Sequence, residues 1–191
     1  MKKLFLFLAL VGISAVSSST RVEKPSNTLS KSLAFPVAGK KSNVGSFWGA
    51  RRDGGRRKHK GIDIFARKGT PVVAICDGTI VTKDHTPIGG KTLWLKSEDH
   101  SLTAYYAHLD KQRVSEGQHV RKGQVIGTVG NTGNARTTPS HLHFGIYTTK
   151  GPVNPYPYVK SSPKVVTSKT VAKKKAVVRK KAAPKKKRSR R

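Results

Sequence analysis

The middle of the chain contains short segments in which every second residue is apolar. In SHLHFGIY, Leu142, Phe144 and Ile146 fall on one face of an extended segment, whereas His141 and His143 fall on the other. The segments KTLWLKS and SLTAYYAHL are also rich in leucine and aromatic residues, and a polar stretch separates them. The pattern predicts three β-strands.

Two further segments each predict a pair of strands around a turn. PVVAICDGTIVTK places Asp77-Gly78 between two apolar runs, and HVRKGQVIGTVG places Lys122-Gly123 in the same way. No stretch between residues 35 and 159 has a helical period with capping residues. Because the strands are short and the turns are closely spaced, we expect an all-β domain over residues 35–159, a mostly antiparallel sandwich or barrel-like structure.

The N-terminal residues predict export from the cytoplasm. Lys2 and Lys3 precede an apolar run over residues 4–16, and small residues lie near its end. This arrangement is typical of a signal peptide, although an uncleaved membrane anchor is the alternative. The run is short for a bilayer span. We therefore expect a signal peptide over residues 1–19, a polar linker over 20–34, and a mature protein in the periplasm, in the cell envelope or secreted.

The positive charge is concentrated near the C-terminus. The 191 residues have a formal net charge of +30, and residues 160–191 contain 15 lysines or arginines and no acidic residue. Because like charges repel and apolar side chains are few, we expect residues 160–191 to be a disordered tail. The tail favours anionic envelope polymers or lipid head groups as partners. A solvated extension without a partner is the alternative. Nucleic acid binding is expected in vitro only.

Cys76 is the single cysteine, so no disulfide can form within the chain. It lies in an apolar run in which Val72, Ala74 and Cys76 share a strand face. We therefore interpret Cys76 as a small buried apolar residue and not as a nucleophile.

The seven histidines differ in their sequence surroundings. His85, His100 and His119 lie in polar stretches, and we assign them no role. In HKGID, His59 and Asp63 are four residues apart, so their side chains share a face in a strand. An acid between two isoleucines needs a partner. Taken alone, however, the pair is more often a hydrogen-bonded structural feature than a set of metal ligands.

The remaining histidines lie in predicted strands. In SLTAYYAHL, His108 shares its strand face with Ala104 and Tyr106, which predicts a hydrogen-bonded histidine in the core. His141 and His143 point to one side of their strand. They are either a polar interruption of a buried strand or part of a metal site.

Considered together, these residues match the ligands that zinc prefers. His59, Asp63 and one histidine of the HLH segment would supply two imidazoles and one carboxylate, and a catalytic zinc site has three protein ligands and one open position. His108 and the other HLH histidine could then take a proton or stabilise an oxyanion. The HExxH motif of helical zinc proteases is absent from the sequence.

Residues 35–157 resemble peptidase family M23, the lysostaphin or LytM family of zinc metallopeptidases. The matching stretches occur in the family's order: the segment from FPVAGKK to DGTIV, then AYYAHLDK, then VSEGQHVRKGQVIGTVGNTG followed by SHLHFGIY. The resemblance implies that His59 and Asp63 form the HxxxD ligand motif and that His143 is the third zinc ligand. It also implies that His108 and His141 are the two catalytic histidines.

What the resemblance implies for function is hydrolysis of peptide bonds in bacterial peptidoglycan, in stem cross-links or glycine bridges, by a largely antiparallel β domain. Zn²⁺ would activate a water molecule and polarise the scissile carbonyl. We assign the general base to His141 and the support of the oxyanion to His108. Peptidoglycan peptides would be the partners of the domain, which we expect to be a monomer.

Three other interpretations stay open. The chain could be a non-catalytic LytM-type envelope module that activates another cell-wall hydrolase, although all five positions carry the residue types of the active members. It could also be a polyanion-binding protein led by the basic tail. The segment EGQHVRKGQVIG further resembles turn elements of lipoyl and biotinyl carrier domains, but no lysine in a carrier-type turn is apparent and a carrier does not need the histidines.

Overall fold

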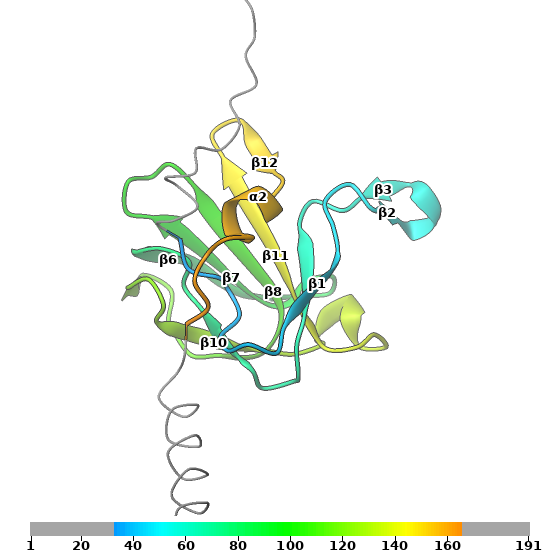
Figure 1. Ribbon diagram of the computed structural model, residues 1–191, viewed down its shortest axis with the longest axis horizontal. Coiled ribbons are helices and arrows are strands. Elements are labelled where there is room, and N and C mark those ends of the chain that lie inside the picture. The colour runs from blue at the N-terminus through cyan, green and yellow to red at the C-terminus, as the bar shows by residue number, and fades with distance from the viewer. Residues whose placement is uncertain (1–32, 166–191) are drawn as a thin grey trace, which may run out of the picture.

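Antiparallel strands dominate residues 33–165, which are the residues that the computed structural model describes (Figure 1). The expected signal peptide, and the tail from residue 166 onward, lie outside the described residues. The elements are β1 (Asn43–Ser46), β2 (Arg51–Arg52), η1 (Asp53–Gly55), β3 (Arg57–Lys58), β4 (Ile62–Phe65), β5 (Pro71–Val73), β6 (Gly78–Thr86), β7 (Gly90–Ser97), β8 (Thr103–Gln112), β9 (His119–Val120), β10 (Val125–Val129), η2 (Gly133–Ala135), β11 (His141–Thr148), β12 (Gly151–Val153) and α2 (Tyr156–Val159).

The main sheet has the strand order β1-β4-β11-β8-β7-β6-β9, while β10 pairs with β5 and β8, and β12 pairs with β11. Every strand pairing among the described residues is antiparallel, which confirms the expected fold class. The short strands β2 and β3 form a separate hairpin that projects from the body of the domain (Figure 1). Within residues 33–165, no helix is long and apolar enough to cross a membrane.

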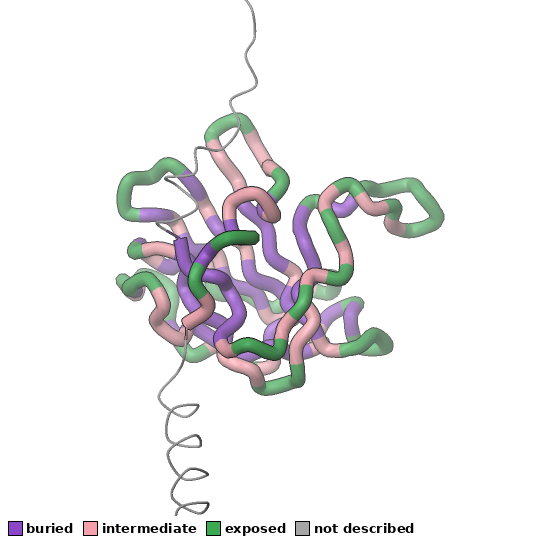
Figure 2. The backbone as a smooth tube through the Cα atoms, in the orientation of Figure 1, coloured by how far each residue is buried: buried purple, intermediate pink, exposed green. Residues whose placement is uncertain are grey.

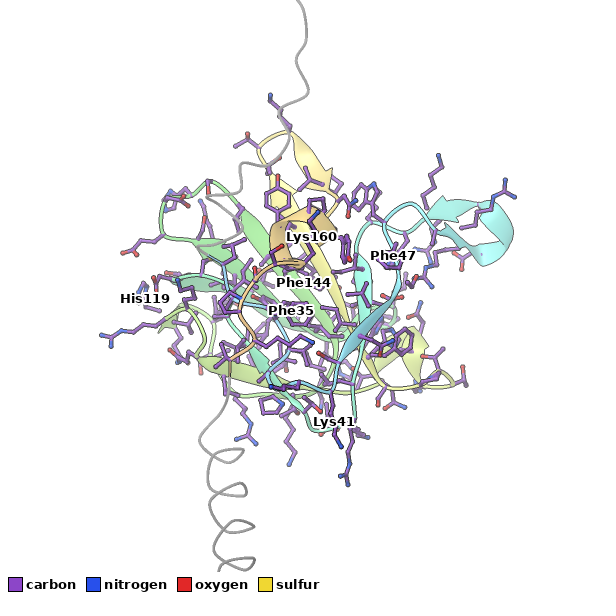
Figure 3. The ribbon with its side chains drawn as sticks, in the orientation of Figure 1. Phe35, Lys41, Phe47, His119, Phe144 and Lys160 are labelled. Atoms are coloured by element: carbon purple, nitrogen blue, oxygen red, sulfur yellow. The ribbon has the colours of Figure 1, made fainter. Side chains whose placement is uncertain are left out.

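The two faces of the central strands differ as the alternation of β11 predicts. Leu142, Phe144 and Ile146 are fully buried, and they belong to one core cluster with Leu33 and Phe35 from the start of the described chain (Figures 2 and 3). Burying a side chain of this size contributes about 1.5–3 kcal/mol. The core therefore fixes β11 on one face and leaves the opposite face for polar side chains.

The predicted strands around Asp77-Gly78 and Lys122-Gly123 all form, but the strands on either side of each turn do not pair with each other. β5 pairs with β10, and β6 pairs with β7 and β9. β10 also pairs with β8. The sequence did not predict these pairing partners, because a turn signal marks a change of direction and does not identify the strand that comes to lie alongside. KTLWLKS and SLTAYYAHL do form a hairpin, β7–β8.

Helical structure within the described residues is limited to the single α-helical turn α2 and the two 3-10 turns η1 and η2. The sequence shows no helical period with capping residues here, and α2 is only four residues long with no side-chain cap. A proline lies in the first turn of α2, where its fixed φ suits a helix start. Val159 at its end is fully buried and packs in the core.

Beyond Val159, residues 160–165 form a C-terminal strap that lies against the start of the described chain. The backbone N–H of Phe35 donates to the carbonyl of Pro163 at 3.1 Å. Lys164 Nζ donates to the carbonyl of Ser42 at 3.0 Å and lies 4.7 Å from the centre of the Phe35 ring. The two ends of the described chain are therefore held side by side on the core face of the sheet.

Candidate active site

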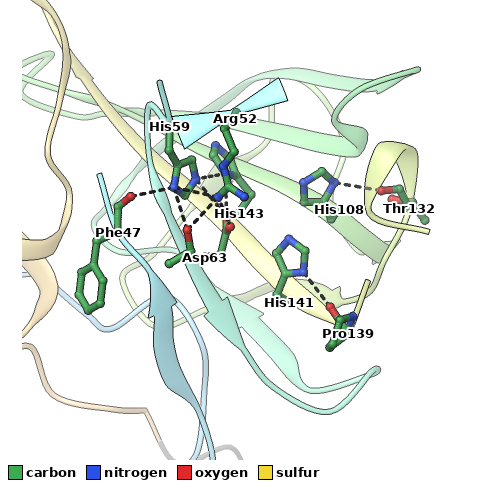
Figure 4. Close-up of polar contacts among 10 residues, drawn as sticks. Phe47, Arg52, His59, Asp63, His108, Thr132, Pro139, His141 and His143 are labelled. Atoms are coloured by element: carbon green, nitrogen blue, oxygen red, sulfur yellow. Dashed lines mark hydrogen bonds and ion pairs between the residues drawn. The ribbon is translucent and has the colours of Figure 1, made fainter. Parts of the chain in front are cut away.

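Three of the expected ligand residues meet on the polar face of β4 and β11. Asp63 and His143 are directly paired across these strands, so their side chains point to the same side. Asp63 Oδ1 lies 3.0 Å from His143 Nδ1 and 3.1 Å from His59 Nε2, and the two nitrogens are 2.9 Å apart (Figure 4). Three donor atoms from two segments far apart in sequence thus surround one point.

The chemistry and spacing of these donors fit a zinc ion. Zinc accepts two imidazoles and a carboxylate at about 2.0–2.2 Å in a tetrahedral arrangement, which requires donor atoms roughly 3.4 Å apart. The three atoms need to separate by only a few tenths of an ångström to reach this spacing. His59 and Asp63 are each 5% exposed, so the donors are also largely shielded from water. His59, Asp63 and His143 could therefore hold a metal ion.

The even spacing in HKGID suggested that His59 and Asp63 lie in one strand. In the structure, His59 lies outside the strand that contains Asp63. It precedes β4 in the loop that follows β3. A close approach at Gly61 makes this loop possible, because a Cβ atom there would lie 2.6 Å from the carbonyl oxygen of Phe144 and 2.7 Å from His143 Cε1. Only glycine lets the loop pass close enough to β11 for His59 to reach the other two donors.

His108 faces the same site, which contradicts the prediction from strand alternation. It has a φ of +60°, in the left-handed region, and the register between β7 and β8 shifts at this point. This β-bulge reverses the alternation. Tyr106 and Leu109 are both fully buried in the core, while His108 between them turns to the polar face. His108 is therefore not a core histidine.

The imidazoles of His108 and His141 are neighbours in an edge-to-face arrangement, with ring centres 5.0 Å apart. His108 Nδ1 lies 2.9 Å from the carbonyl oxygen of Thr132, and His141 Nδ1 lies 2.8 Å from that of Pro139 (Figure 4). A carbonyl oxygen only accepts, so each Nδ1 carries the hydrogen in the neutral ring. Each Nε2 consequently keeps a lone pair that can take a proton.

Burial is the largest single influence on the pKa values of His108, His143 and Asp63. It lowers the pKa of His108 to about 4, and the neighbouring His141 and His143 add to this effect. Burial also lowers the pKa of His143. Burial acts to raise the pKa of Asp63, but hydrogen bonds from His143 and His59 outweigh it and hold that pKa well below its usual range. At neutral pH the site therefore combines a carboxylate with neutral His108 and His143, the forms suited to metal binding and proton uptake.

The site also contains residues that the sequence did not reveal. Arg52 Nη2 donates to Asp63 Oδ2 at 2.5 Å and to Ser46 Oγ at 2.9 Å. The carbonyl oxygen of Phe47 lies 3.0 Å from His59 Nδ1, a position that leaves Nε2 facing the other donors. The basic run GARRDGGRRKH contains five arginine or lysine residues, one of which is Arg52, and nothing in the run distinguishes Arg52 from the rest.

The histidines without an assigned role, His85, His100 and His119, are all exposed. Cys76 is partly buried against the core, and burial raises its pKa to about 12. A thiol that stays protonated is a poor nucleophile, in agreement with the apolar interpretation.

Comparison with known sequences identifies related proteins. The sequence model of peptidase family M23 matches residues 57–155. An L-Ala–D-Glu endopeptidase of Bacillus subtilis (strain 168) is 38% identical over 128 residues, which are 61% of this chain and 39% of that protein. The murein hydrolase activator NlpD of Salmonella dublin is 41% identical over 102 residues, which are 53% of this chain and 26% of that protein. The chain thus spans less than half the length of these relatives.

Comparison with solved structures points to the same family as the sequence matches. The catalytic domain of lysostaphin, an antimicrobial peptidase from Staphylococcus simulans, is similar with a TM-score of 0.57 and 31% sequence identity. The similarity covers 73% of this chain and all of that domain. The family match covers more than half of the chain and includes all five residues of the candidate site. This chain belongs to peptidase family M23.

Proposed function

We propose that this protein is a zinc-dependent endopeptidase that hydrolyses peptide bonds, in stem cross-links, of bacterial peptidoglycan. The observation that supports it most directly is the convergence of the donor atoms of His59, Asp63 and His143 beside two further histidines whose Nε2 atoms are free to take a proton. Membership of family M23 supports the same reaction class.

In this proposal His59 holds the metal through Nε2, Asp63 through Oδ1 and His143 through Nδ1. When bound, zinc supplies a Lewis acid that polarises the scissile carbonyl and lowers the pKa of a water molecule. The protein keeps these donors in place by the pairing of β4 with β11 and by the contact of His59 Nδ1 with the Phe47 carbonyl. Fixing the far nitrogen of a ligating histidine selects the nitrogen that faces the metal.

We assign His141 as the general base and His108 as the residue that supports the oxyanion. Both rings enter the reaction with an unprotonated Nε2. His141 can therefore accept a proton from the attacking water. His108 can donate to an oxyanion only after it is protonated, and a negative charge that develops beside it would raise its pKa and favour that state. The two histidines thus begin with the same nitrogen unprotonated but perform different tasks in the reaction.

The proposal is tested by digesting purified peptidoglycan with the full chain, with and without a chelator, alongside His143→Ala. We expect soluble fragments from the wild-type protein, restored activity when zinc is added back after chelation, and little release by His143→Ala because one ligand is lost. Mass spectrometry of the fragments would identify the bond that is cut. Equal release in all arms would contradict the zinc mechanism.

A second candidate is a non-catalytic module that activates another cell-wall hydrolase. The similarity to the murein hydrolase activator NlpD favours it. The presence of all five site residues in one group favours the enzyme instead. Folded, zinc-loaded protein that releases nothing by itself but increases digestion by a second hydrolase would establish the activator.

We further propose that the protein is exported and that its basic C-terminal residues attach it to anionic polymers or lipid head groups of the envelope. The charge of residues 160–191 supports the attachment. The substrate, peptidoglycan, lies outside the cytoplasm, so the proposed activity and the proposed export agree.

A further inference from the structure

The two oxygens of the Asp63 carboxylate have different partners (Figure 4). Oδ1 lies 3.0 Å from His143 Nδ1 and 3.1 Å from His59 Nε2, so it belongs to the group of metal donors. Oδ2 lies 2.5 Å from Arg52 Nη2. The side chain of Asp63 is 7% exposed and that of Arg52 is 37% exposed, so the ion pair reaches from the interior to the surface.

We propose that Arg52 is a positioning residue of the metal centre, which occupies Oδ2 of Asp63 so that the carboxylate presents Oδ1 alone to the metal. The inference rests on the proposed function, because it concerns the same zinc site. Arg52 acts through Asp63 and does not itself contact the metal position.

An arginine suits this task because of its charge and its donors. Burying a carboxylate without a counter-charge is costly. The histidines that offer lone pairs to a metal are neutral and supply no charge. Arg52 is the only arginine or lysine that forms an ion pair with Asp63 among residues 33–165. It therefore keeps the carboxylate compensated and oriented in the protein before a metal arrives.

The orientation of Arg52 is fixed in turn by the hairpin that carries it. Arg52 lies on β2, and its Nη2 also donates to Ser46 Oγ at 2.9 Å. Ser46 ends β1, the strand that pairs with β4 next to Asp63. One nitrogen of the guanidinium thus connects the projecting hairpin with the strands that hold the site. Ligating carboxylates commonly depend on such outer contacts.

Because of a further contact, it matters whether the removal of Arg52 strengthens or weakens zinc binding. Arg52 Nη2 is 3.0 Å from His59 Nδ1. When His59 binds a metal through Nε2, Nδ1 carries a hydrogen and cannot accept from Arg52. The positive charge of Arg52 then opposes a nearby dication. If Arg52 were only a neighbouring charge, its removal would strengthen zinc binding. If it positions Asp63, its removal weakens zinc binding.

The neighbouring Arg51 provides a matched control. It lies on the same short strand, and consecutive side chains of a strand point to opposite sides. Arg51 is exposed and pairs through its backbone with Lys58 of β3. Arg51→Gln therefore removes the same charge from the same hairpin without touching the carboxylate.

The test is a competition titration of the full chain with Zn²⁺ against a chromophoric chelator, in the wild type, Arg52→Gln, Arg52→Lys and Arg51→Gln. We expect Arg52→Gln to bind zinc about 10–100-fold more weakly, the range found when outer contacts of a ligand are removed. Arg52→Lys should recover part of the loss, because an ammonium group also donates to Oδ2. Arg51→Gln should bind zinc as the wild type does.

A spectroscopic measurement separates positioning from simple loss of stability. We expect the visible absorption of the Co²⁺-substituted protein to change in Arg52→Gln, because a carboxylate released from Arg52 can bind through both oxygens, and to remain unchanged in Arg51→Gln. If Arg52→Gln does not fold by circular dichroism, the same comparison is made with Arg52→Lys, for which a smaller change of the spectrum is expected because one ammonium group holds Oδ2 less firmly than the guanidinium does.

Two results would overturn the inference. In the first, Arg52→Gln binds zinc as tightly as the wild type or more tightly, with an unchanged Co²⁺ spectrum. In the second, Arg51→Gln and Arg52→Gln lose zinc affinity equally, which would assign the effect to a general disturbance of the hairpin and not to the contact of Arg52 with Asp63. Both leave zinc binding by the wild-type protein intact, so they are distinguishable from a failure of the proposed function, in which the wild-type protein itself binds no zinc.

Discussion

His108 combines a buried imidazole with a carbonyl partner and two other histidines nearby. Burial disfavours the charged ring and, with His141 and His143, lowers its pKa to about 4. The hydrogen bond to the Thr132 carbonyl opposes this shift but does not cancel it. The folded protein therefore resists protonation of His108 between its ordinary pKa of 6.5 and about 4.

This shift predicts a pH-dependent loss of stability in the metal-free protein. The folded pKa is lower than the unfolded one, so the unfolded chain binds the proton more readily. The contribution of neutral His108 to the free energy of unfolding is complete above about pH 6.5 and is lost as the pH falls toward 4. We expect His108→Asn to lose less stability than the wild type over this interval, by an amount on the order of 3 kcal/mol.

Urea unfolding with chelator at several pH values from 7 to 4 measures this difference. His85→Asn, at an exposed histidine, is the control and should follow the wild-type curve. Parallel curves for His108→Asn and the wild type would contradict the argument.

Residue types in the sequence were enough to select the five histidine and aspartate residues that lie together in the structure. The partners of these residues could not be selected in the same way. The carbonyl oxygens of Phe47, Thr132 and Pro139 belong to the backbone and leave no mark in the sequence. Arg52 is one of several basic residues in its segment, and only the fold distinguishes it.

At the level of elements, β8 changes its partner at the bulge. Its first part, through Ala107, pairs with β11, and its last part, from Leu109, pairs with β10. His108 lies at the junction with a positive φ. The alternation of buried and polar side chains therefore fails at the residue where the strand changes from one pairing partner to another. An alternating sequence pattern does not reveal such a bulge. For β11, which has no such junction at its histidines, alternation predicted both faces correctly.

The loop between β3 and β4 depends on the small size of Gly61. A Cβ added there would overlap the backbone of Phe144 and the ring of His143. We expect Gly61→Ala to displace His143 from the other donors, to weaken zinc binding, and to lower the free energy of unfolding by about 1–3 kcal/mol, the usual cost of overpacking. Calorimetric zinc titration and urea unfolding of the metal-free protein measure the two effects.

Gly145→Ala is the matched control, because Gly145 lies on β11 two positions after His143. The nearest atom to its added Cβ, at 3.2 Å, belongs to the side chain of Tyr147, which can move. We expect a smaller loss of stability and wild-type zinc affinity. Equal zinc affinity of Gly61→Ala and the wild type would show that the close approach does not position His143.

At the scale of the whole molecule, composition and alternation predicted an all-β antiparallel domain, and this is confirmed. The order of strands was not predictable, because β5 and β6 follow each other in sequence and yet pair with different strands. The C-terminal strap was also missed. Its residues 160–165 were assigned to the tail by charge, yet Lys164 contacts both Ser42 and the Phe35 ring.

The strap determines where the tail can be removed without disturbing the fold. We expect a chain that ends at Val165 to unfold at the wild-type temperature, and one that ends at Val159 to unfold at a lower temperature because the strap contacts are lost. Both should be retained less on peptidoglycan sacculi at low salt, because fewer positive charges remain. Thermal unfolding and co-sedimentation at several salt concentrations measure these effects.

Hydrolysis of a small soluble peptide by the chain that ends at Val165 is the control for this experiment, and it should equal that of the full chain. Undiminished retention on sacculi after this truncation would contradict electrostatic attachment by the tail.

The contacts between the strap and the start of the described chain also have a mechanical consequence. Phe35 is bonded to Pro163, and Gly39 is bonded to Val165, through single backbone hydrogen bonds. A pulling force applied between the two flanking segments would load these bonds first, while β4, β8 and β11 would remain in register. If both flanking segments were attached to a strained wall, the strap would detach before the three donor residues moved apart.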